Sequence, residues 1–594
     1  MKSLQSKMAA IGVLLVMTPM LPAQQSSFVR GPQAPPRNQF AYGLTKAYRE
    51  RPISGINMRN TGRLDQLVRA GKLYLSLQDA IALTLENNID IEIQRYGPEL
   101  AKIDLDRANA GGLIRGVQTG VQQGAQSATN FLTGGGQAGG GGGGFVGGGG
   151  GGGGTSLSGT VFQVTGTNIP TLDPVFSFGY NRGKTSQPQI NSFITGTTAV
   201  VTETNSWNTQ IQKNFLTGTG VTLSYDNLGV TTNQLTADLN PFTRGNMSLQ
   251  VTQRLLQGFG MAVNNRNIVI GRNNVRVSDL TFKQQIITTV SSVINLYWDL
   301  VSFNEAVRVR KQALALAQKL LSDNQKQVEI GTLAPIEIVR AEAEVARNQQ
   351  DVTIAETQVR QQEQILKNQL SRNGVANPLL RDVSIITTDR ISVPENEVIA
   401  PAQDLVDQAL KTRPELEQTR INIENTKIGL AGARSALLPS LDVFASAANR
   451  GLAGSPRQGA IRQPDAFFVG GFGTAIGQVF RRNFPDYNVG FQLNIPLRNR
   501  AAQADIANDT LRLRQQELQE QRQLNSVRLE VQNAQIALEQ ARAQYQAAVK
   551  NRQGVLSLLL ERYPAEEIPA DAGRNEFEQL VHRYEVPRTR SREL

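Results

Sequence analysis

The sequence predicts an α+β membrane protein in which long antiparallel coiled-coil hairpins continue into strands of a transmembrane β-barrel. Three observations predict this fold class. Apolar residues recur at every seventh position through long segments, other segments alternate apolar and polar residues, and the order of these patterns occurs twice along the 594 residues. Sustained heptads wind helices around one another, and alternation is typical of a barrel strand with lipid on one face and water on the other.

The N-terminal segment, residues 1–23, has the pattern of a secretory signal peptide. Lys2 and Lys7 form its charged start, residues 8–21 its apolar stretch, and Leu21-Pro22-Ala23 a small-residue cleavage site. The alternative is a simple membrane anchor. Residues 24–75 follow as a proline-rich leader that we expect to be disordered. No later segment offers about 18 uninterrupted apolar residues, so we expect an exported protein without a helical anchor.

Composition excludes several classes of site. The formal net charge is +11, from 61 basic and 50 acidic residues. Because Lys and Arg are spread beside Glu and Asp, they are typical of solvated helix faces, and we expect no nucleic-acid partner. The chain has no cysteine and one histidine, His582, which excludes disulfides, lipid attachment at an N-terminal cysteine, thiolate metal sites and His-based triads. We therefore predict no enzyme activity, no catalytic residues, no cofactor and no metal site.

The first structural repeat spans residues 76–370 and opens with a short helical region. Ser76 with Asp79 three residues on has the pattern of a capping box, and the helix is expected from Leu77 to about Ala110. A glycine-rich insertion, 133–155, lacks the Gly-Lys-Ser/Thr ending of a phosphate-binding loop, which favours a flexible insertion. The glycines around Gly473 are similarly expected in a loop before a strand.

Strands are predicted within residues 173–256 and again near residue 490. Side chains there alternate between apolar and uncharged polar types, which fits a strand between lipid and water but also a soluble sandwich. The apolar members are Phe176, Phe178, Tyr180, Val221, Leu223, Tyr225, Met247, Leu249, Val251, Val489, Phe491, Leu493 and Ile495. A neighbouring stretch, residues 441–445, alternates less cleanly.

A long helical hairpin is predicted for residues 265–370. The chain contains no proline between Asn265 and Gly331, so the first helix could reach roughly 100 Å. Its two heptad rows are Ile286, Val293, Leu300, Val307, Leu314, Leu321 and Val328, then Ile338, Val345, Val352, Val359 and Leu366. A hairpin of this length is typical of a tube wall or strut rather than an enzyme core.

A second structural repeat is predicted for residues 401–559, after a linker at 371–400. Residues 77–91 align without gaps on residues 402–416, and each copy continues through a helix and strands into a long helix. The final long helix begins near Arg500. Its row of sevens contains Val527, Ala534, Ala541, Ala548 and Val555, where alanine permits close helix approach.

These pieces, taken in order across the two copies, resemble the TolC family of outer membrane efflux proteins. The matching segments are Leu77 to Asn88, Tyr297-Trp298-Asp299-Leu300, Glu329-Ile330-Gly331-Thr332-Leu333, Glu337 to Ala346, Arg413-Pro414-Glu415-Leu416, Ala433 to Ser440 and Tyr487 to Pro496. The resemblance implies a homotrimer in which each chain lends four strands to one twelve-stranded barrel, with the helices forming a periplasmic tube. It implies a passive outer membrane channel for efflux of small molecules or type I secretion of polypeptide in a Gram-negative-type bacterium. Its partners would be outer membrane lipid, a periplasmic adaptor protein and, indirectly, an inner-membrane pump.

The tail, residues 560–594, departs from the family pattern. The family has a second hairpin turn and a returning long helix here, whereas this tail contains Pro564, Pro569 and Pro587 and no heptads. The codons possible for residues 566–577, read one base later, can encode KKYQLMQAATNS, which resembles the missing turn. We hypothesise a frameshift that removed the final long helix. A gene sequence without a long open frame past this point would refute it.

The candidate site is the tip of the first hairpin. It comprises Val328, Gly331, Thr332, Leu333 and Pro335. The glycine can adopt the turn conformation, and Leu333 is expected as an exposed apolar knob for an adaptor. The alternative is a turn without a partner.

Three further residues of the long helices have a structural and a functional interpretation. Glu329 is a candidate acid at the pore mouth, although such residues more often belong to solvated helix faces. Tyr297 and Trp298 are expected to pack the tube or to lie at the membrane interface.

Two other functions remain open on the sequence. One is a soluble periplasmic coiled-coil scaffold whose strands form a cap. The other is a truncated family member without channel function. Fractionation with the outer membrane as a heat-modifiable trimer distinguishes a channel subunit from a scaffold.

Overall fold

The computed structural model describes residues 48–53, 55–117, 120–128, 171–391, 400–458 and 463–562. The expected signal peptide, residues 24–47 and 54 of the leader, the glycine-rich insertion, His582 and the tail beyond residue 562 lie outside the described residues. Residues Met1–Met58 form one unit, whose described part contains no helix or strand. All elements below belong to the second unit, Arg59–Leu594.

The helical region that opens the first repeat is divided into α4 (Leu77–Asn87) and α5 (Ile89–Asn109), where the sequence predicted one helix. Ser76 caps α4, since its Oγ accepts a hydrogen bond from the amide of Asp79 at 3.1 Å, as predicted. Asn88 divides the helices because it has extended backbone and its Oδ1 accepts from the amides of the next helix. The amide of the same side chain reaches Gln369 Oε1 at 2.8 Å, which ties this corner to another helix.

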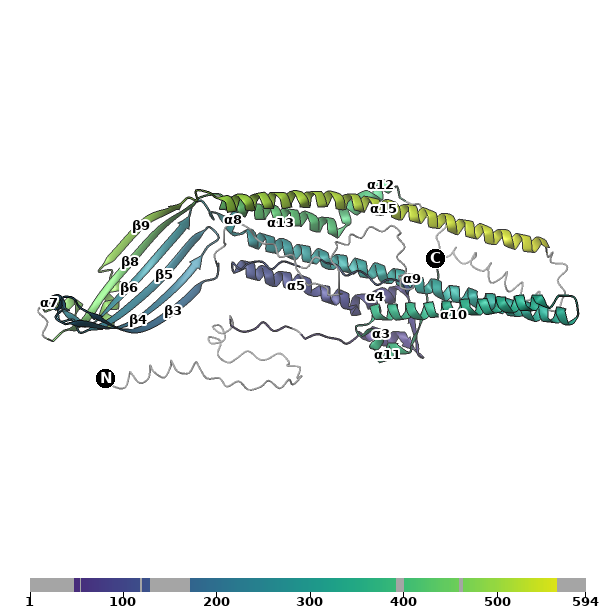
Figure 1. Cartoon of the computed structure of the whole chain (residues 1–594), viewed down its shortest axis with the longest axis horizontal. Coiled ribbons are helices and arrows are strands. Elements are labelled where there is room, and N and C mark those ends of the chain that lie inside the picture. The colour runs from purple at the N-terminus through teal and green to yellow at the C-terminus, as the bar shows by residue number, and fades with distance from the viewer. Residues whose placement is uncertain are drawn as a thin grey trace, which may run out of the picture. The chain divides into compact units, whose positions relative to one another are not determined.

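A six-stranded antiparallel sheet follows (Figure 1). Its strands are β3 (Val175–Pro188), β4 (Ala199–Asn214), β5 (Thr219–Thr232), β6 (Leu239–Arg254), β8 (Ser440–Pro456) and β9 (Pro485–Asn494), in the order β3-β4-β5-β6-β8-β9. Short α7 (Ser192–Thr195) joins the first two strands. The described residues therefore supply six strands to this sheet, and the four strands implied by the family resemblance are wrong for it. Four of the six lie within residues 173–256, where strands were predicted.

The long hairpin consists of α9 (Arg266–Glu329) and α10 (Ile336–Leu370), preceded by α8 (Met261–Asn264). With 64 residues, α9 is about 96 Å long. The side chains of both predicted heptad rows are buried or half-buried, so the predicted apolar seam is present. Two ion pairs cross between the helices, Arg310 to Asp351 at 2.9 Å and Lys311 to Glu356 at 2.7 Å.

The predicted leader and linker meet in a small sheet. The end of the leader forms α3 (Gly62–Leu67), β1 (Val68–Arg69) and β2 (Lys72–Leu75). The linker forms η1 (Gly374–Ala376), α11 (Pro378–Arg381) and β7 (Ser384–Thr387). Strand β2 pairs with β7 in parallel, which gives the order β1-β2-β7. Both intervals differ from the unstructured segments that the sequence suggested, because each strand is too short to be stable or recognisable without its distant partner.

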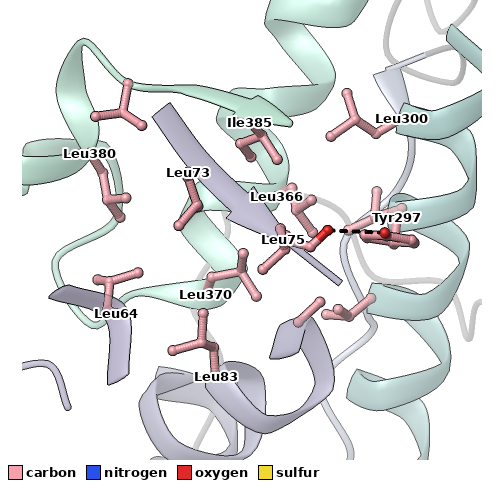
Figure 2. Close-up of a cluster of buried hydrophobic side chains, with 14 of the residues drawn as sticks. Leu64, Leu73, Leu75, Leu83, Tyr297, Leu300, Leu366, Leu370, Leu380 and Ile385 are labelled. Atoms are coloured by element: carbon pink, nitrogen blue, oxygen red, sulfur yellow. Dashed lines mark hydrogen bonds between the residues drawn. The ribbon is translucent and has the colours of Figure 1, made fainter. Parts of the chain in front are cut away.

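An apolar core surrounds this small sheet (Figure 2). Tyr297 is fully buried in it, and its hydroxyl lies 3.1 Å from the carbonyl oxygen of Leu75 and 2.9 Å from Asp389 Oδ2. The other large side chains are Leu64, Leu73, Leu75, Leu83, Val293, Leu296, Leu300, Leu366, Leu370, Leu380 and Ile385. The core thus joins β2, α4, α9, α10 and β7.

By length and composition alone, α9 is the one helix of the described residues that could cross a membrane, and one third of its most apolar stretch is buried. Four apolar residues of α9, from Val293 to Leu300, belong to the core around the small sheet. Packing within the fold therefore accounts for part of this apolar character.

The residues predicted as a second repeat contain, in order, α12 (Ala402–Thr412), α13 (Pro414–Ala436), β8, η2 (Ala466–Phe468), α14 (Phe472–Phe480), β9 and α15 (Arg500–Arg562). The first two helices have 11 and 23 residues, close to the 11 and 21 of α4 and α5. Val527 is buried on α15, which packs against α12 and α13. Farther along, Ala534, Ala541 and Ala548 are exposed. Within the described residues, this distal half of α15 therefore lacks a helix partner for its predicted seam.

Candidate functional site

The register of the large sheet places its side chains on two chemically different faces. Paired residues in an antiparallel ladder share a face, and successive residues alternate. The mainly apolar face includes Phe176, Phe178, Tyr180, Trp207, Ile211, Val221, Leu223, Tyr225, Met247, Leu249, Val251, Leu441, Val443, Ala445, Ala447, Tyr487, Val489, Phe491 and Leu493, and it also carries Thr209, Lys213, Asn227, Gln253 and Asn449. The polar face includes Ser177, Asn181, Ser206, Asn208, Gln210, Thr222, Ser224, Asp226, Asn246, Ser248, Gln250, Ser446, Asn488 and Gln492.

An aromatic cluster lies on the apolar face. The ring of Trp207 is 5.1 Å from that of Tyr225, 6.5 Å from Phe178 and 6.0 Å from Phe472 of α14, between ring centroids. Farther along the same face of β3 and β4 the side chains are charged, and Lys184 forms an ion pair with Glu203 at 3.0 Å. Aromatic rings at the border between an apolar band and charged residues are typical of the membrane–water interface of a transmembrane barrel.

Helix α14 lies against the apolar face, over positions where the strands lack large side chains. The carbonyl oxygen of Ala475 lies 2.1 Å from where a Cβ on Gly451 would be, and Val479 approaches both Gly451 and Gly245. Gln478 anchors the helix, because its Oε1 accepts from the amide of Leu452 at 2.8 Å and its Nε2 donates to the carbonyl of a residue in η2. The predicted loop here is therefore a helix. Gly473 and Gly477 are typical of a loop, which is why no helix was predicted. The packing of this helix on Gly245 and Gly451 depends on tertiary structure and cannot be read from the local sequence.

The hairpin tip is a tight turn between α9 and α10. Gly331 has φ +84°, in the left-handed region that favours glycine, as the sequence predicted. The amide and hydroxyl of Thr332 both donate to the carbonyl oxygen of Gln327 at 2.9 Å, which closes the end of α9. Pro335 is exposed at the start of α10, and Val328 is half-buried in the seam.

The exposed apolar side chain at this tip differs from the predicted one. Leu333 is half-buried, and its prediction as an exposed knob is wrong. Ile330 is instead 77% exposed, with Ile336 and Val339 exposed beside it. Ile330 and Leu333 lie on either side of Gly331, whose left-handed backbone reverses the chain between them.

The other predicted residues are separated from the tip. Glu329 is exposed at the end of α9, beside the tip. Tyr297 and the half-buried Trp298 pack edge to face, 5.7 Å apart, in the core around the small sheet, far along α9 from Glu329. They therefore pack the helical part, which was one of the two predicted roles.

Buried charge near the small sheet was not recognised from the sequence. Glu363 and Lys367 lie one turn apart on α10 and are almost fully buried. Burial raises the pKa of the Glu363 carboxyl and lowers the pKa of the Lys367 ammonium. Glu363 Oε1 accepts from the amide of Ile385 in β7 at 3.0 Å, so Glu363 joins α10 to the small sheet. Heptad analysis treats both positions as ordinary helix-surface residues, which is why no signal marked them.

Strand β4 lies within the predicted strand region but was not recognised as a separate strand, because its sequence is mostly polar and few large apolar residues, Trp207 and Ile211 among them, mark its apolar face. Among the residues that the structure describes, no group of three or more His, Asp or Glu side chains could hold a metal ion. What the geometry offers is one face suited to lipid, one suited to water, and long helices that continue from the sheet.

Comparison with known proteins adds an independent observation. A search of curated protein sequences finds no match. Residues 195–371, from the β3–β4 connection to the end of α10, match the family model described as outer membrane efflux protein. Among solved structures, the chain is similar to a crystal structure of CusC, with 12% identity, a TM-score of 0.46 and coverage of 82% of this chain and 80% of that one.

Two further channel structures show comparable similarity. The Campylobacter jejuni CmeC outer membrane channel has 14% identity and a TM-score of 0.46, with 88% of this chain and 86% of that chain covered. The outer membrane protein VceC of Vibrio cholerae has 12% identity and a TM-score of 0.44, with 85% and 88% covered. Residues 195–371 thus match the outer membrane efflux protein family, and over this part of the chain the resemblance to the TolC family is confirmed.

Proposed function

We propose that this chain is a channel subunit of the outer membrane component of a tripartite efflux or type I secretion system. In this proposal three copies close a barrel in the outer membrane of a Gram-negative-type bacterium, and their long helices extend it into the periplasm. Small molecules or polypeptide pass through the duct without a catalytic step.

The observation that carries the proposal is the two-faced sheet joined directly to long helices. In a lipid bilayer every backbone polar group needs a partner, which only helices and closed barrels provide. A sheet with aromatic and aliphatic residues on one face and Ser, Thr, Asn and Gln on the other is suited to such a barrel. Supercoiled helices of about 96 Å then enclose water without a conventional core.

The hairpin tip is the proposed contact with a periplasmic adaptor, through which an inner-membrane pump would be coupled. Ile330, Ile336 and Val339 form an exposed apolar patch there, beside the exposed Glu329. An apolar patch rimmed by polar residues is typical of a protein-interaction surface. The family match supports an efflux role in general, and the particular pump and cargo are outside it.

The test is expression of the full chain, separation of inner membrane, outer membrane and periplasm, and electrophoresis with and without heating. We expect an outer membrane protein that migrates as a heat-modifiable trimer and conducts ions across a planar bilayer. A periplasmic protein without conductance would favour the soluble coiled-coil scaffold. A membrane-bound monomer without conductance would favour a truncated, non-functional family member.

A further inference from the structure

The two edge strands of the large sheet, β3 and β9, are unpaired along their outer sides within the described residues. Both are long for open edges, with 14 and 10 residues. Their apolar-face residues are strongly exposed, including Phe178 at 62% and Phe491 at 72%. Long, apolar, unpaired edges promote association in water and are not tolerated in lipid, so each edge needs a partner strand.

Strand polarity makes the two edges complementary to each other. All five ladders of the sheet are antiparallel, so the six strands alternate in direction and β9 runs opposite to β3. Strand β9 of one copy can therefore pair with β3 of the next in the same antiparallel pattern. Pro485 lies at the first position of β9, where the missing amide removes no ladder bond from the strand interior.

The faces restrict the register of this junction. If all ten residues of β9 pair within β3 and the apolar faces stay together, Phe491 lies opposite Phe178, Tyr180 or Arg182 of the next copy. The first register is the one that places Leu493, Phe491 and Val489 all opposite aromatic residues. Its outward pairs are Leu493 with Phe176, Phe491 with Phe178, Val489 with Tyr180, and Tyr487 with Arg182. The other two registers place Val489 or Phe491 opposite a charged residue.

The stagger of the first register also fits a closed barrel. The stagger is found by following paired residues from strand to strand. Val175 of β3 pairs with Gln212, which pairs with Thr222, and the series continues through Gln250 and Ser446 to Asn488 of β9. In the first register Asn488 lies opposite Asn181 of the next copy, six residues beyond the starting point. Six residues over six strands is a stagger of one residue per strand. With a rise of ~3.4 Å per residue and a strand spacing of ~4.8 Å, this stagger corresponds to a strand tilt of about 35°, which is at the lower end of the range for barrels. By the same geometry the second register would require about 43°, inside that range, and the third about 50°, outside it. The stagger therefore excludes the third register, and the pairing of Val489 with a charged residue disfavours the second.

We infer that copies of this chain join β9 to β3 with Phe491 opposite Phe178, and that three copies close an 18-stranded barrel. The inference rests on the proposed channel function and goes beyond it, because the family resemblance implies twelve strands. Since barrel diameter grows roughly linearly with strand number, the barrel is about 1.5 times wider than a twelve-stranded one. Its polar face lines an aqueous lumen, as in barrels of 16–18 strands.

The test uses cysteine pairs, since the chain has no cysteine of its own. In the first register N181C faces N488C, and S177C faces Q492C, all at exposed positions of the polar face. The swapped pairs, N181C with Q492C and S177C with N488C, use the same four positions but lie four residues out of register, ~13 Å apart. Disulfides require Cα atoms within about 7 Å, so the swapped pairs are matched controls.

Oxidation of the full-length double variants in detergent is followed by heated, non-reducing electrophoresis. We expect both matched pairs to form a covalent trimer and the swapped pairs to stay monomeric after heating. A native outer membrane trimer that forms no link with either matched pair, or that links through a swapped pair, would overturn the inference and leave the channel function standing. Absence of any oligomer and of membrane association would instead remove the proposed function and the inference with it.

Discussion

At the scale of single residues, Gly451 decides whether α14 can lie on the sheet. A Cβ at this position would meet the backbone oxygen and carbon of Ala475 at 2.1 and 2.9 Å, and backbone atoms cannot move aside as a flexible side chain can. A side chain here therefore has to displace the helix. By contrast, a Cβ on Gly477 within α14 would meet no atom within 4 Å.

We predict that Gly451→Ala lowers the free energy of unfolding by about 1–3 kcal/mol, the usual cost of overpacking. Trp207 contacts Phe472 of α14, so displacement of the helix is expected to shift the Trp207 emission to longer wavelength. The only other tryptophan, Trp298, is removed by Trp298→Phe in the background. Gly477→Ala is the control, and we expect it to be neutral or stabilising by about 0.5–1 kcal/mol through helix propensity. Equal effects of both substitutions would contradict the assigned packing.

A second residue-scale feature is the hydroxyl of Tyr297 in the core. Asp389 Oδ2 lies 2.9 Å from it and also accepts from the amide of Leu77 at 2.7 Å, so one carboxylate connects α9 to the start of α4. Burial raises the pKa of Tyr297 to about 12. The folded state therefore retains the phenolic proton more strongly than the unfolded chain, where the pKa is about 10.

It follows that the stabilising effect of Tyr297 is fully present below pH 10 and is lost as the pH rises from 10 to 12. We predict that Tyr297→Phe costs about 1.5–3 kcal/mol near neutral pH, because a hydrogen bond to a charged group is lost. The difference between wild type and variant should shrink over pH 10–12 in chemical unfolding. Tyr96→Phe, at an exposed tyrosine, serves as the control. A difference that stays constant across this range would contradict the assignment.

At the scale of elements, two apolar residues of the hairpin tip, Leu333 and Ile330, differ in how exposed they are to a partner. Leu333 is half-buried, while Ile330 is exposed at the end of α9. We predict that Ile330→Asp abolishes efflux or secretion without lowering thermal stability, because it places a charge in the proposed adaptor contact. Export of a transported dye from intact cells and a thermal melt are the two measurements.

The matched control for the tip is Val309→Asp, at an exposed valine on the shaft of the same hairpin. We expect it to leave export unchanged. A photo-crosslinking residue at position 330 should capture a periplasmic protein identifiable by mass spectrometry, and the same residue at 309 should not. Equal capture at both positions, or none at 330, would count against an adaptor contact at the tip.

At the scale of the whole molecule, the distal half of α15 has no helix partner in the described part of the single chain. Ile536 is 61% exposed there, and Leu529 and Leu538 are exposed beside it. If copies assemble as proposed, these side chains are covered by a neighbouring subunit. We predict that Ile536→Glu lowers the temperature at which the trimer dissociates in detergent electrophoresis by several degrees, because it places a charge in an apolar contact. Asn533→Glu, at an exposed polar position on the same helix, should have no effect.

Much of the helical part could be predicted from the sequence because helix periodicity is local. The heptad rows of α9 and α10 predicted a seam that is present in the fold, and Ser76 with Asp79 marked the start of α4. Gly331 likewise marked the tip, since its positive φ is a property of one residue and its neighbours. For the same reason, alternation identified the apolar face of β3, β5, β6 and β9.

The remaining features depend on contacts between distant segments. Strand β4 carries little alternation of its own and is ordered by pairing with β3 and β5 along its length. Strands β2 and β7 pair across more than 300 residues, so neither was visible as a strand. Helix α14 depends on two glycines of other strands, and burial of Leu333 depends on the turn that precedes it.

By itself, then, the sequence determined the periods: which segments are long helices, which alternate, where the tip turns, and which family the pattern resembles. Only the tertiary structure decided how many strands the chain supplies, which edges stay open, and which tip residue is exposed. The physical reason is that a period is carried by neighbouring residues, whereas a strand partner or a packed helix is chosen by the free energy of contacts formed only after the chain has folded.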